Sequence, residues 1–467
     1  MINYFNFKPF KDKVLITNDM GKYQFVSEET LSAMVNNSHI EEDVLAQLKD
    51  KFFVYDEYDE ILAEKAKYYI RDSKSYLFSS TSLHIFVLTN ICNMSCVYCQ
   101  AKDDTNIVHH AMSAETAEKC VDIALQSPSR FLCFEFQGGE PLANFEILKH
   151  IVLYTEEKKG SKCISFNVVS NLTLLTDEML EFLAEHRVGI STSLDGDKEV
   201  HDKNRCLTGG CGTYDIVVGK IKQIKETGLS IGAIQTTTRY SLNKHKEIID
   251  EYIRNGQASI FIRPLTCLGT AARVWDEIGY TAEEFIDFYK KSLLYILELN
   301  KQGIDICENH AVIFLKKILL GISENYMELR SPCGAAIGQI AYFYDGNVFT
   351  CDEGRMLYEM GDEAFKLGNV YENNYDELMQ SPICKSVCVS SCLESQLKCC
   401  DCVYQPYCGT CPVVNLAQEK DLFFKNQNAF RCKIYGGMLD TIFEILYNED
   451  MENIRIFNKW IGVDTYE

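Results

Sequence analysis

Three cysteines near residue 95 have the spacing of a metal-cluster site. Cys92, Cys96 and Cys99 form a C-x3-C-x2-C motif directly after a β-branched and aromatic run at residues 83–90. Three thiolates this close can hold three irons of a [4Fe–4S] cube and leave the fourth iron open to a small molecule. A structural zinc site usually takes four protein ligands, and no histidine or fourth cysteine stands beside these three. Zinc, or a chance grouping, is the alternative.

A second group of cysteines lies near the C-terminus. Of the 21 cysteines in the chain, eleven fall between residues 333 and 432. Disulfide scaffolds belong mainly to short secreted chains, so in a chain of 467 residues clustered thiols favour metal binding or catalysis. Two spacings, C-x12-G-x4-C and C-x2-C-x5-C-x2-C, single out Cys333, Cys351, Cys399, Cys402, Cys408 and Cys411, and Cys432 follows. Zinc ribbons also use C-x2-C pairs, and that interpretation stays open.

The elements that would position the first cysteines alternate regularly. Six short β-branched and aromatic runs, at residues 83–90, 131–139, 164–171, 188–196, 231–239 and 259–265, are separated by helical stretches such as 113–126, 176–186 and 214–228. Strand–helix units in series predict a parallel sheet covered by helices, curled into a barrel or partial barrel. Working residues of such folds lie at the C-terminal ends of the strands, and these runs end in polar or glycine-rich residues.

Composition changes divide the chain into five predicted parts. Two strand-like runs and two helical runs predict a winged-helix-like module at 1–80, with Ser27 as a helix N-cap; a simple extension packed on the next domain is the alternative. The other parts are a partial barrel at 81–275, a helical bridge at 276–329, a cysteine-rich domain with short strands at 330–440 and a C-terminal helix and tail at 441–467.

The charge and hydropathy patterns exclude several classes of protein. Lys and Arg total 46 against 67 Asp and Glu, which gives a formal net charge of −21 and speaks against a broad nucleic-acid or anionic membrane surface. No apolar stretch approaches the ~18 residues of a transmembrane helix. The first residues lack the basic and apolar segments of a secretion signal. We therefore expect a cytoplasmic globular protein.

The triad and the strand ends together resemble the radical S-adenosylmethionine (SAM) superfamily. The supporting motifs are the cysteines with Tyr98 before the last one, Gly138-Gly139-Glu140-Pro141, and the stretch from Ser193 to Arg205. The resemblance implies an α/β partial (β/α)6 barrel whose cluster binds SAM at its open iron. An electron then cleaves the sulfonium, and the resulting 5′-deoxyadenosyl radical abstracts hydrogen from a C–H bond.

The same resemblance assigns cofactor-binding positions. Glycines allow the backbone to approach the ligand, and the Glu140 carboxylate can receive the SAM ammonium. Ser193 and Arg205 would contact the SAM carboxylate or ribose. Asn171 and Leu265 are the candidates for contacts with the ribose and adenine. The positions assigned in this way are Tyr98, Gly138, Gly139, Glu140, Asn171, Ser193, Asp195, Arg205 and Leu265.

The C-terminal cysteines resemble the SPASM domain of radical SAM peptide maturases, which holds two auxiliary [4Fe–4S] clusters. One cluster would be held by Cys399, Cys402, Cys408 and Cys432, and the other by Cys333, Cys351 and Cys411. Two residues separate Cys408 from Cys411 where the family has three, and Cys400 offers an alternative register beside Cys399. The fourth ligand of the second cluster is open, with Cys392 as one candidate and a substrate atom as another. Asp352, directly after Cys351, matches a proposed proton acceptor of sulfatase maturases; a solvent-facing acid is the alternative.

Stretches along most of the chain are similar to the maturases of the His-Xaa-Ser peptide system, among them FEFQGGEPLANF and YDGNVFTCDEGRM. The expected function is a radical SAM maturase that cross-links a ribosomally made peptide. Side-chain oxidation or epimerisation, as in sulfatase maturases, is the runner-up, and an Fe–S scaffold without catalysis is a third alternative. The implied partners are a precursor peptide, whose leader the 1–80 module captures by strand addition, and an electron donor such as flavodoxin or ferredoxin.

Overall fold

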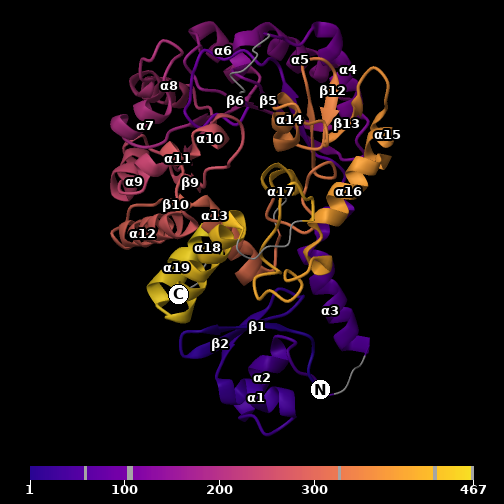
Figure 1. Ribbon diagram of the computed structural model, residues 1–467, viewed down its shortest axis with the longest axis vertical. Coiled ribbons are helices and arrows are strands. Elements are labelled where there is room, and N and C mark those ends of the chain that lie inside the picture. Colours follow the sequence, from indigo (N-terminus) through magenta and orange to yellow (C-terminus); the bar gives the residue numbers. More distant parts are fainter. Residues whose placement is uncertain (57–59, 102–108, 324–327, 424–428, 464–467) are drawn as a thin grey trace.

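Side chains alternate along the predicted strands, and this alternation gives the sheet two unlike faces. In β5 (Phe131–Gln137), Phe134 and Phe136 are buried in the main core, while Glu135 and Gln137 face a cavity. Successive residues of a strand point to opposite faces, so one face packs on helices and the other can stay polar. The computed structural model, drawn in Figure 1, describes residues 1–56, 60–101, 109–323, 328–423 and 429–463.

The six predicted strands form one parallel sheet, which confirms the α/β fold class. Within the described residues this sheet has ten strands in the order β10-β9-β8-β7-β6-β5-β4-β11-β12-β13. Neighbours from β10 through β4 to β11 run parallel, whereas β12 and β13 are antiparallel additions. The bounds are β4 Leu83–Val87, β6 Cys163–Val169, β7 Gly189–Ser193, β8 Ile231–Thr236, β9 Ser259–Arg263, β10 Cys307–Glu308, β11 Gln339–Tyr342, β12 Asn347–Phe349 and β13 Lys366–Asn369.

Helices lie along the outside of this sheet (Figure 1). Those that follow the strands are α4 Ala114–Leu125, η2 Pro141–Asn144, α5 Phe145–Lys158, α6 Asp177–Glu185, α7 Lys198–Asn204, α8 Tyr214–Glu226, η3 Arg239–Ser241 and α9 His245–Arg254. α10 Gly269–Arg273 precedes the helical bridge predicted at 276–329, and α11 Trp275–Ile278 crosses its start. The bridge contains α12 Ala282–Lys301, α13 Asn309–Leu315 and the π-helical turn η4 Lys316–Leu320. None of the described helices is both long and apolar enough to cross a membrane.

The cysteine-rich region is joined to the barrel through the sheet itself. β11 pairs in parallel with β4, the strand that precedes the Cys92 triad, and β12 and β13 extend the sheet further. Its helices are α14 Asp352–Glu359, α15 Tyr375–Gln380, α16 Pro382–Ser391, η5 Leu393–Ser395 and α17 Pro412–Glu419. α18 (Phe430–Tyr447) runs without a break across the predicted boundary at residue 440, and α19 (Met451–Trp460) follows.

The N-terminal residues form a small unit with its own core. β1 (Asn6–Phe10), β2 (Lys13–Thr17) and β3 (Tyr23–Val26) make an antiparallel meander, followed by α1 Glu28–Asn36, α2 Glu42–Asp50, α3 Glu60–Ser73 and η1 Ser75–Phe78. Ser27 caps α1 as predicted, because its side chain accepts a 3.1 Å hydrogen bond from the Thr30 backbone N–H. Figure 1 shows this unit at the end of the molecule opposite the barrel helices.

Candidate functional site

A cavity of about 520 Å³ collects most of the predicted site residues. Its wall comes from the inner face of the sheet, the loop after β4 and the start of α14. The predicted residues that line it are Cys92, Cys96, Tyr98, Cys99, Gly138, Gly139, Glu140, Asn171, Ser193, Arg205 and Asp352. Residues spread over more than 250 positions of sequence therefore meet at one site.

The three thiols of the triad are largely buried, and burial controls their protonation. Burial, with a smaller contribution from the neighbouring thiols of the triad, raises the pKa of Cys92 to about 11 and that of Cys99 to about 12. The Cys92 sulfur also accepts hydrogen bonds from the Met94 backbone N–H at 3.5 Å and from Asn171 Nδ2 at 3.9 Å. Without a metal these groups are neutral thiols, so metal binding must release their protons.

The two glycines of the GGE segment bring the strand end close to the triad loop. A Cβ on Gly138 would lie 2.5 Å from the Thr89 carbonyl oxygen, and one on Gly139 would lie 2.4 Å from that of Ile91. The Gly139 and Glu140 N–H groups donate to these same two carbonyls at 2.7 Å. The glycines therefore fix the backbone that leads into Cys92 against the end of β5.

Glu140 presents a buried, oriented carboxylate to the cavity. It accepts hydrogen bonds from Ser170 Oγ at 2.7 Å, from the Asn171 N–H at 2.8 Å and from the Leu142 N–H at 3.1 Å. Burial raises its pKa, while these donors oppose the rise. A carboxylate held in this way suits a ligand ammonium group.

Arg205 is held by a buried chain of side chains. Its Nη1 donates to Tyr98 Oη at 2.8 Å, and Tyr98 Oη donates to Asp195 Oδ2 at 2.8 Å. Arg205 Nε is buried and has no hydrogen-bond partner in the part of the chain that the structure describes. This donor, the glycine cradle and the Glu140 carboxylate together fit a polar, zwitterionic ligand such as SAM.

Two predicted contacts are not in the cavity wall. Asp195 is fully buried behind Tyr98, where it also accepts from Asn204 Nδ2 at 3.0 Å, so it positions Tyr98 and Arg205 from behind. Leu265 is buried as well and lines a separate small cavity with Thr266. The motifs predict the residue type at these two positions, but they do not predict whether the side chain points into the cavity or into the core behind it.

The cavity wall also contains four charged residues that the motifs did not predict, which are Arg263, Glu328, Glu353 and Arg355. Arg355 Nε donates to Oδ1 of the predicted residue Asp352 at 2.8 Å, and Arg263 pairs with Glu328 at 3.1 Å. Asp352 is therefore a cavity residue and not a solvent-facing acid. The sequence feature that could have predicted Glu353 and Arg355 as cavity residues is the CDEGR segment, in which three charged residues follow the predicted cluster ligand Cys351.

Comparison with known proteins identifies the domain that carries this cavity. Residues 86–262 match the Radical SAM superfamily. The chain belongs to this superfamily. An uncharacterized protein of Methanothermobacter thermautotrophicus is 30% identical over 219 residues, 46% of this chain and 79% of the relative. A cysteine-type anaerobic sulfatase-maturating enzyme of Clostridium novyi is 24% identical over 342 residues, 70% of this chain and 87% of the relative.

Solved structures share the fold of this radical SAM chain over most of its length. The structure described as native anSMEcpe with bound AdoMet has a TM-score of 0.68 at 21% identity and covers 80% of this chain and 99% of its own. Streptococcus suis SuiB bound to its precursor peptide SuiA has a TM-score of 0.56 at 16% identity and covers 92% of this chain and 99% of its own.

Outside its radical SAM cavity, the chain gathers the C-terminal cysteines into two groups. Cys333, Cys351 and Cys411 are buried in one apolar cluster with Val387 and Val413. In the other group, burial raises the pKa of the Cys408 thiol, and Cys402, Cys432 and Cys399 raise it further because they lie near it. Among the described residues no three His, Cys, Asp or Glu side chains converge on a single metal ion. The two auxiliary clusters therefore stay a prediction.

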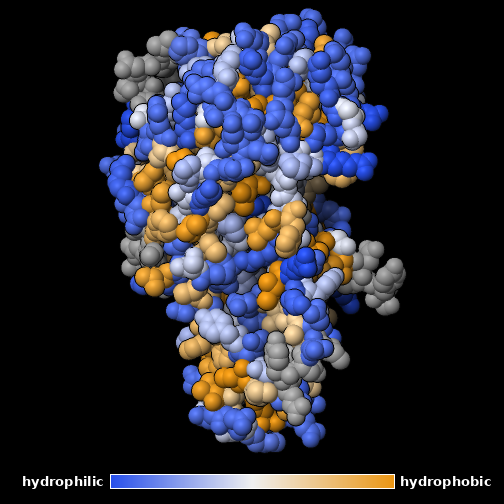
Figure 2. Space-filling model, turned by 90° about the vertical axis from the view of Figure 1, so that its right-hand side faces the viewer, coloured by the Kyte–Doolittle hydropathy of each residue, from blue (hydrophilic) through white to orange (hydrophobic). Residues whose placement is uncertain are grey.

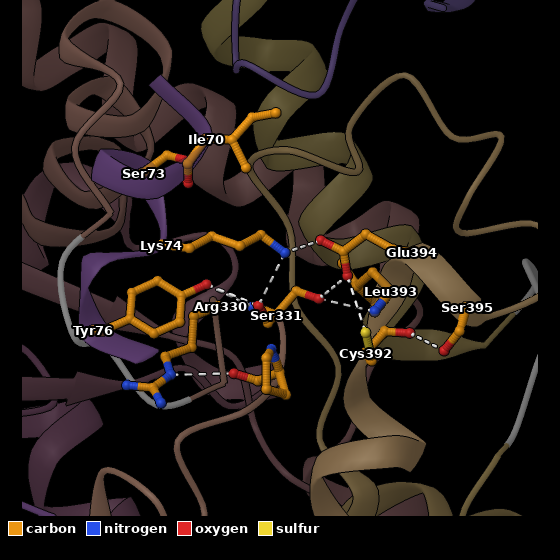
Figure 3. Close-up of polar contacts among 11 residues, drawn as sticks. Ile70, Ser73, Lys74, Tyr76, Arg330, Ser331, Cys392, Leu393, Glu394 and Ser395 are labelled. Carbon is orange, nitrogen blue, oxygen red and sulfur yellow. Dashed lines mark hydrogen bonds and ion pairs between the residues drawn. The ribbon is translucent and has the colours of Figure 1, made fainter. Parts of the chain in front are cut away.

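Cys392 is outside the packed group of Cys333, Cys351 and Cys411. Its thiol hydrogen-bonds to Glu394 Oε2 at 3.3 Å, and Figure 3 shows Glu394 also reaching Lys74 and Ser331. Its role as the fourth ligand therefore stays a prediction. Cys400 lies beside Cys399, and its backbone carbonyl accepts from Asn6 Nδ2 at 3.0 Å.

Proposed function

We propose that this radical SAM chain is a maturase of a ribosomally made peptide and joins two residues of that peptide by a C–C, thioether or ether bond. The observation that carries this proposal is the single cavity whose wall contains the triad, most of the SAM-binding motif residues and Asp352. When bound, the cluster and SAM supply a 5′-deoxyadenosyl radical that abstracts hydrogen from a C–H bond. The similarity in sequence to His-Xaa-Ser maturases supports assignment to a related subgroup.

The chain's own residues hold the SAM and exclude water. Glu140 would receive the SAM ammonium, and Arg205 Nε would donate to its carboxylate or ribose, with Ser193 and Asn171 beside them. Tyr98 and Asp195 fix the direction of Arg205 through two 2.8 Å hydrogen bonds. Holding the reacting groups in one geometry supplies much of the rate enhancement in such a site.

Asp352 is the proposed proton acceptor for the peptide. Its contacts with Arg355 Nε and Nη2 both end on Oδ1, and Oδ2 has no hydrogen-bond partner among the described residues. Its side chain is 17% exposed and lies in the cavity wall. Cross-linking removes two hydrogens from the peptide. One would leave as a hydrogen atom to the 5′-deoxyadenosyl radical, and the other as a proton to Asp352 Oδ2 and an electron to an auxiliary cluster.

The N-terminal unit is the proposed docking site for the precursor leader. Its three-stranded sheet has strands β1 and β3 at its edges, and an extended peptide can add to such an edge. Large apolar side chains are exposed on the same unit, among them Ile2, Phe7 and Val35, and Figure 2 shows apolar surface on this narrow part of the molecule. The external electron donor would be a flavodoxin or ferredoxin, and the cofactors would be SAM and three [4Fe–4S] clusters.

Coexpression with a candidate precursor from a neighbouring short reading frame tests the proposal by mass spectrometry. A cross-link predicts a loss of two hydrogens and missing backbone fragments between the joined residues. Unchanged precursor mass in the presence of active SAM cleavage would contradict it. Asp352→Asn is the matched variant, because it keeps the side-chain size and removes the carboxylate. This variant should cleave SAM but release little cross-linked peptide.

Side-chain oxidation is the second candidate function. The position of Asp352 in the cavity and the similarity to a sulfatase-maturating enzyme over 87% of its length favour it. The same mass spectra separate the candidates, because an oxidised residue leaves backbone fragmentation intact on both sides. Unchanged mass with deuterium uptake from solvent would instead indicate epimerisation.

A further inference from the structure

Lys317 is a buried cation without a counter-charge of its own. It lies in the π-helical turn η4, its residue is 4% exposed, and its Nζ donates to the backbone carbonyls of Leu329 and Tyr407, the latter at 3.0 Å. No carboxylate of the described chain lies within ion-pair distance of it. Two neutral carbonyls satisfy the hydrogen bonds of the ammonium but not its charge, so its burial is costly unless a negative group lies nearby.

The group that the fold places near Lys317 is the Cys408 thiol, which would become a negatively charged thiolate as a cluster ligand. Tyr407, whose carbonyl receives the ammonium, directly precedes Cys408, and both Lys317 and Cys408 line a cavity of about 200 Å³. The next residue, Gly409, packs so closely that a Cβ would lie 2.1 Å from the Glu328 carbonyl oxygen, which holds the Cys408 loop in place.

Three other cations near these cysteines are neutralised or differently engaged. Figure 3 shows Lys74 directed at Glu394. Arg330 Nε donates to the Pro332 carbonyl at 3.1 Å, and the guanidinium lies 4.2 Å from the ring centre of Tyr76. Lys8, which lies near Cys402, pairs with Asp440 at 2.6 Å, and both side chains are about two-fifths exposed. Among the described residues, Lys317 is a buried lysine that lines the same cavity as Cys408 and has no carboxylate within ion-pair distance.

We propose that Lys317 is the fixed positive charge that sets the reduction potential of the auxiliary cluster on Cys399, Cys402, Cys408 and Cys432. This inference rests on the proposed function, which predicts a cluster at these four thiols. A four-thiolate cluster is anionic, and one added electron makes it more so. A buried ammonium stabilises the reduced form more than the oxidised form and raises the potential, because the low dielectric inside a protein screens it weakly.

The test is a redox titration of the full-length chain, monitored by electron paramagnetic resonance with dithionite as the reductant. A background with Cys92, Cys96 and Cys99 changed to Ala leaves only the auxiliary clusters, and the signal lost on Cys408→Ala identifies the relevant one. Lys317→Gln keeps a donor for the two carbonyls but removes the charge. We expect its ratio of reduced to oxidised cluster at fixed potential to fall at least tenfold, which is about 59 mV for one electron.

Matched variants separate charge from packing. Lys317→Arg keeps the charge and should keep the midpoint, and Lys8→Gln removes a solvent-screened, paired lysine and should also keep it. A second result would also support a need for the charge. In that result the cluster assembles in Lys317→Arg, and it fails to assemble in both Lys317→Gln and Lys317→Met. An unchanged midpoint in either neutral variant, or loss of the cluster in Lys317→Arg as well, overturns the proposal. Absence of any signal that depends on Cys408 overturns the ligand set itself, while SAM cleavage by the wild-type chain tests the radical SAM site separately.

Discussion

At the scale of single residues, burial and metal binding are linked through the proton. The triad thiols are buried strongly enough to be neutral at physiological pH, since the pKa of Cys92 is raised to about 11 and that of Cys99 to about 12. Each must become a thiolate to hold iron. Cluster assembly is therefore the event that places negative charge at this end of the cavity, next to Arg205.

Changing Cys96 to Ala should abolish SAM cleavage, because two thiolates cannot hold the cube with one open iron. The measurement is 5′-deoxyadenosine release under reductant after anaerobic reconstitution. Cys163→Ser is the control, since Cys163 is exposed and outside all three cysteine groups. Retained 5′-deoxyadenosine production in the Cys96 variant would contradict the ligand assignment.

Changing Gly139 to Ala should weaken SAM binding without unfolding the chain. Its Cβ would lie 2.4 Å from the Ile91 carbonyl oxygen, so the backbone before Cys92 must move away from the end of β5. We expect at least a tenfold loss in SAM affinity, equivalent to about 1.4 kcal/mol, measured by equilibrium dialysis on the reconstituted chain. Gly232→Ala is the matched control because nothing lies within 4 Å of its added Cβ. Equal affinities in the two variants would refute the close-approach argument.

Residues whose role follows from their type and spacing can be predicted from the sequence. Residues whose role depends on where the side chain points, or on a distant contact, are predicted less well. The triad, the glycines and Glu140 are found from motifs because their types are dictated by iron, by close approach and by charge. Asp195 shares a motif with Ser193, yet only Ser193 lines the cavity. Lys317 has no local signal at all, because its meaning comes from the distant Tyr407 carbonyl.

At the scale of elements, the pairing of β11 with β4 joins the cysteine-rich region to the barrel. His84 lies at this join, with its ring stacked on Tyr342 of β11 and its Nδ1 3.0 Å from the Tyr342 hydroxyl oxygen. Complete burial lowers the pKa of His84 to about 3. The imidazole of His84 is therefore neutral in the folded chain at pH values well above 3.

His84 should make the chain less stable in mild acid. Below about pH 6.5 an unfolded histidine binds a proton that the folded one does not bind. The contribution of His84 to the free energy of unfolding therefore falls as the pH drops from 6.5 toward 3, and it is constant above that window. His84→Phe should reduce the loss between pH 7 and pH 5 by about 2 kcal/mol, measured by urea unfolding of the metal-free chain. Exposed His39→Phe is the control. The same pH slope in His84→Phe and wild type would show that His84 is protonated in the fold.

Elements with strong local patterns are predicted well, and those that depend on a distant partner are not. The six barrel strands and α12 follow from alternation and helical periodicity, and all are present. β10 has two residues and exists only because β9 lies beside it, and β13 exists only beside β12. The helical stretch predicted near the C-terminus divides at Glu449, whose φ of 50° ends α18, and Asp450 then caps α19.

At the scale of the whole molecule, the N-terminal unit covers the loop of the last cysteine group. Thr17 Oγ1 donates to the Val403 carbonyl at 2.7 Å, and Asn6 Nδ2 donates to that of Cys402 at 3.1 Å. Phe25 packs edge-on against Tyr447 of α18, with ring centres 5.0 Å apart. The unit predicted to bind the precursor thus also covers the loop of a predicted auxiliary cluster, as the alternative of an extension packed on the next domain would have it.

Deleting residues 1–80 should therefore have two effects. Precursor affinity, measured by fluorescence polarisation of a labelled leader, should fall because the edge strands are removed. Iron content should fall from about 12 to about 8 per chain, because the loop around Cys402 loses its cover, while uncoupled SAM cleavage continues at the intact triad. The double change Thr17→Ala and Asn6→Ala is the matched variant: it should lose iron but keep its affinity for the leader. Unchanged leader affinity after the deletion would contradict the role of residues 1–80 in leader binding. An unchanged iron content would show that the cluster on the Cys402 loop assembles without contacts from residues 1–80.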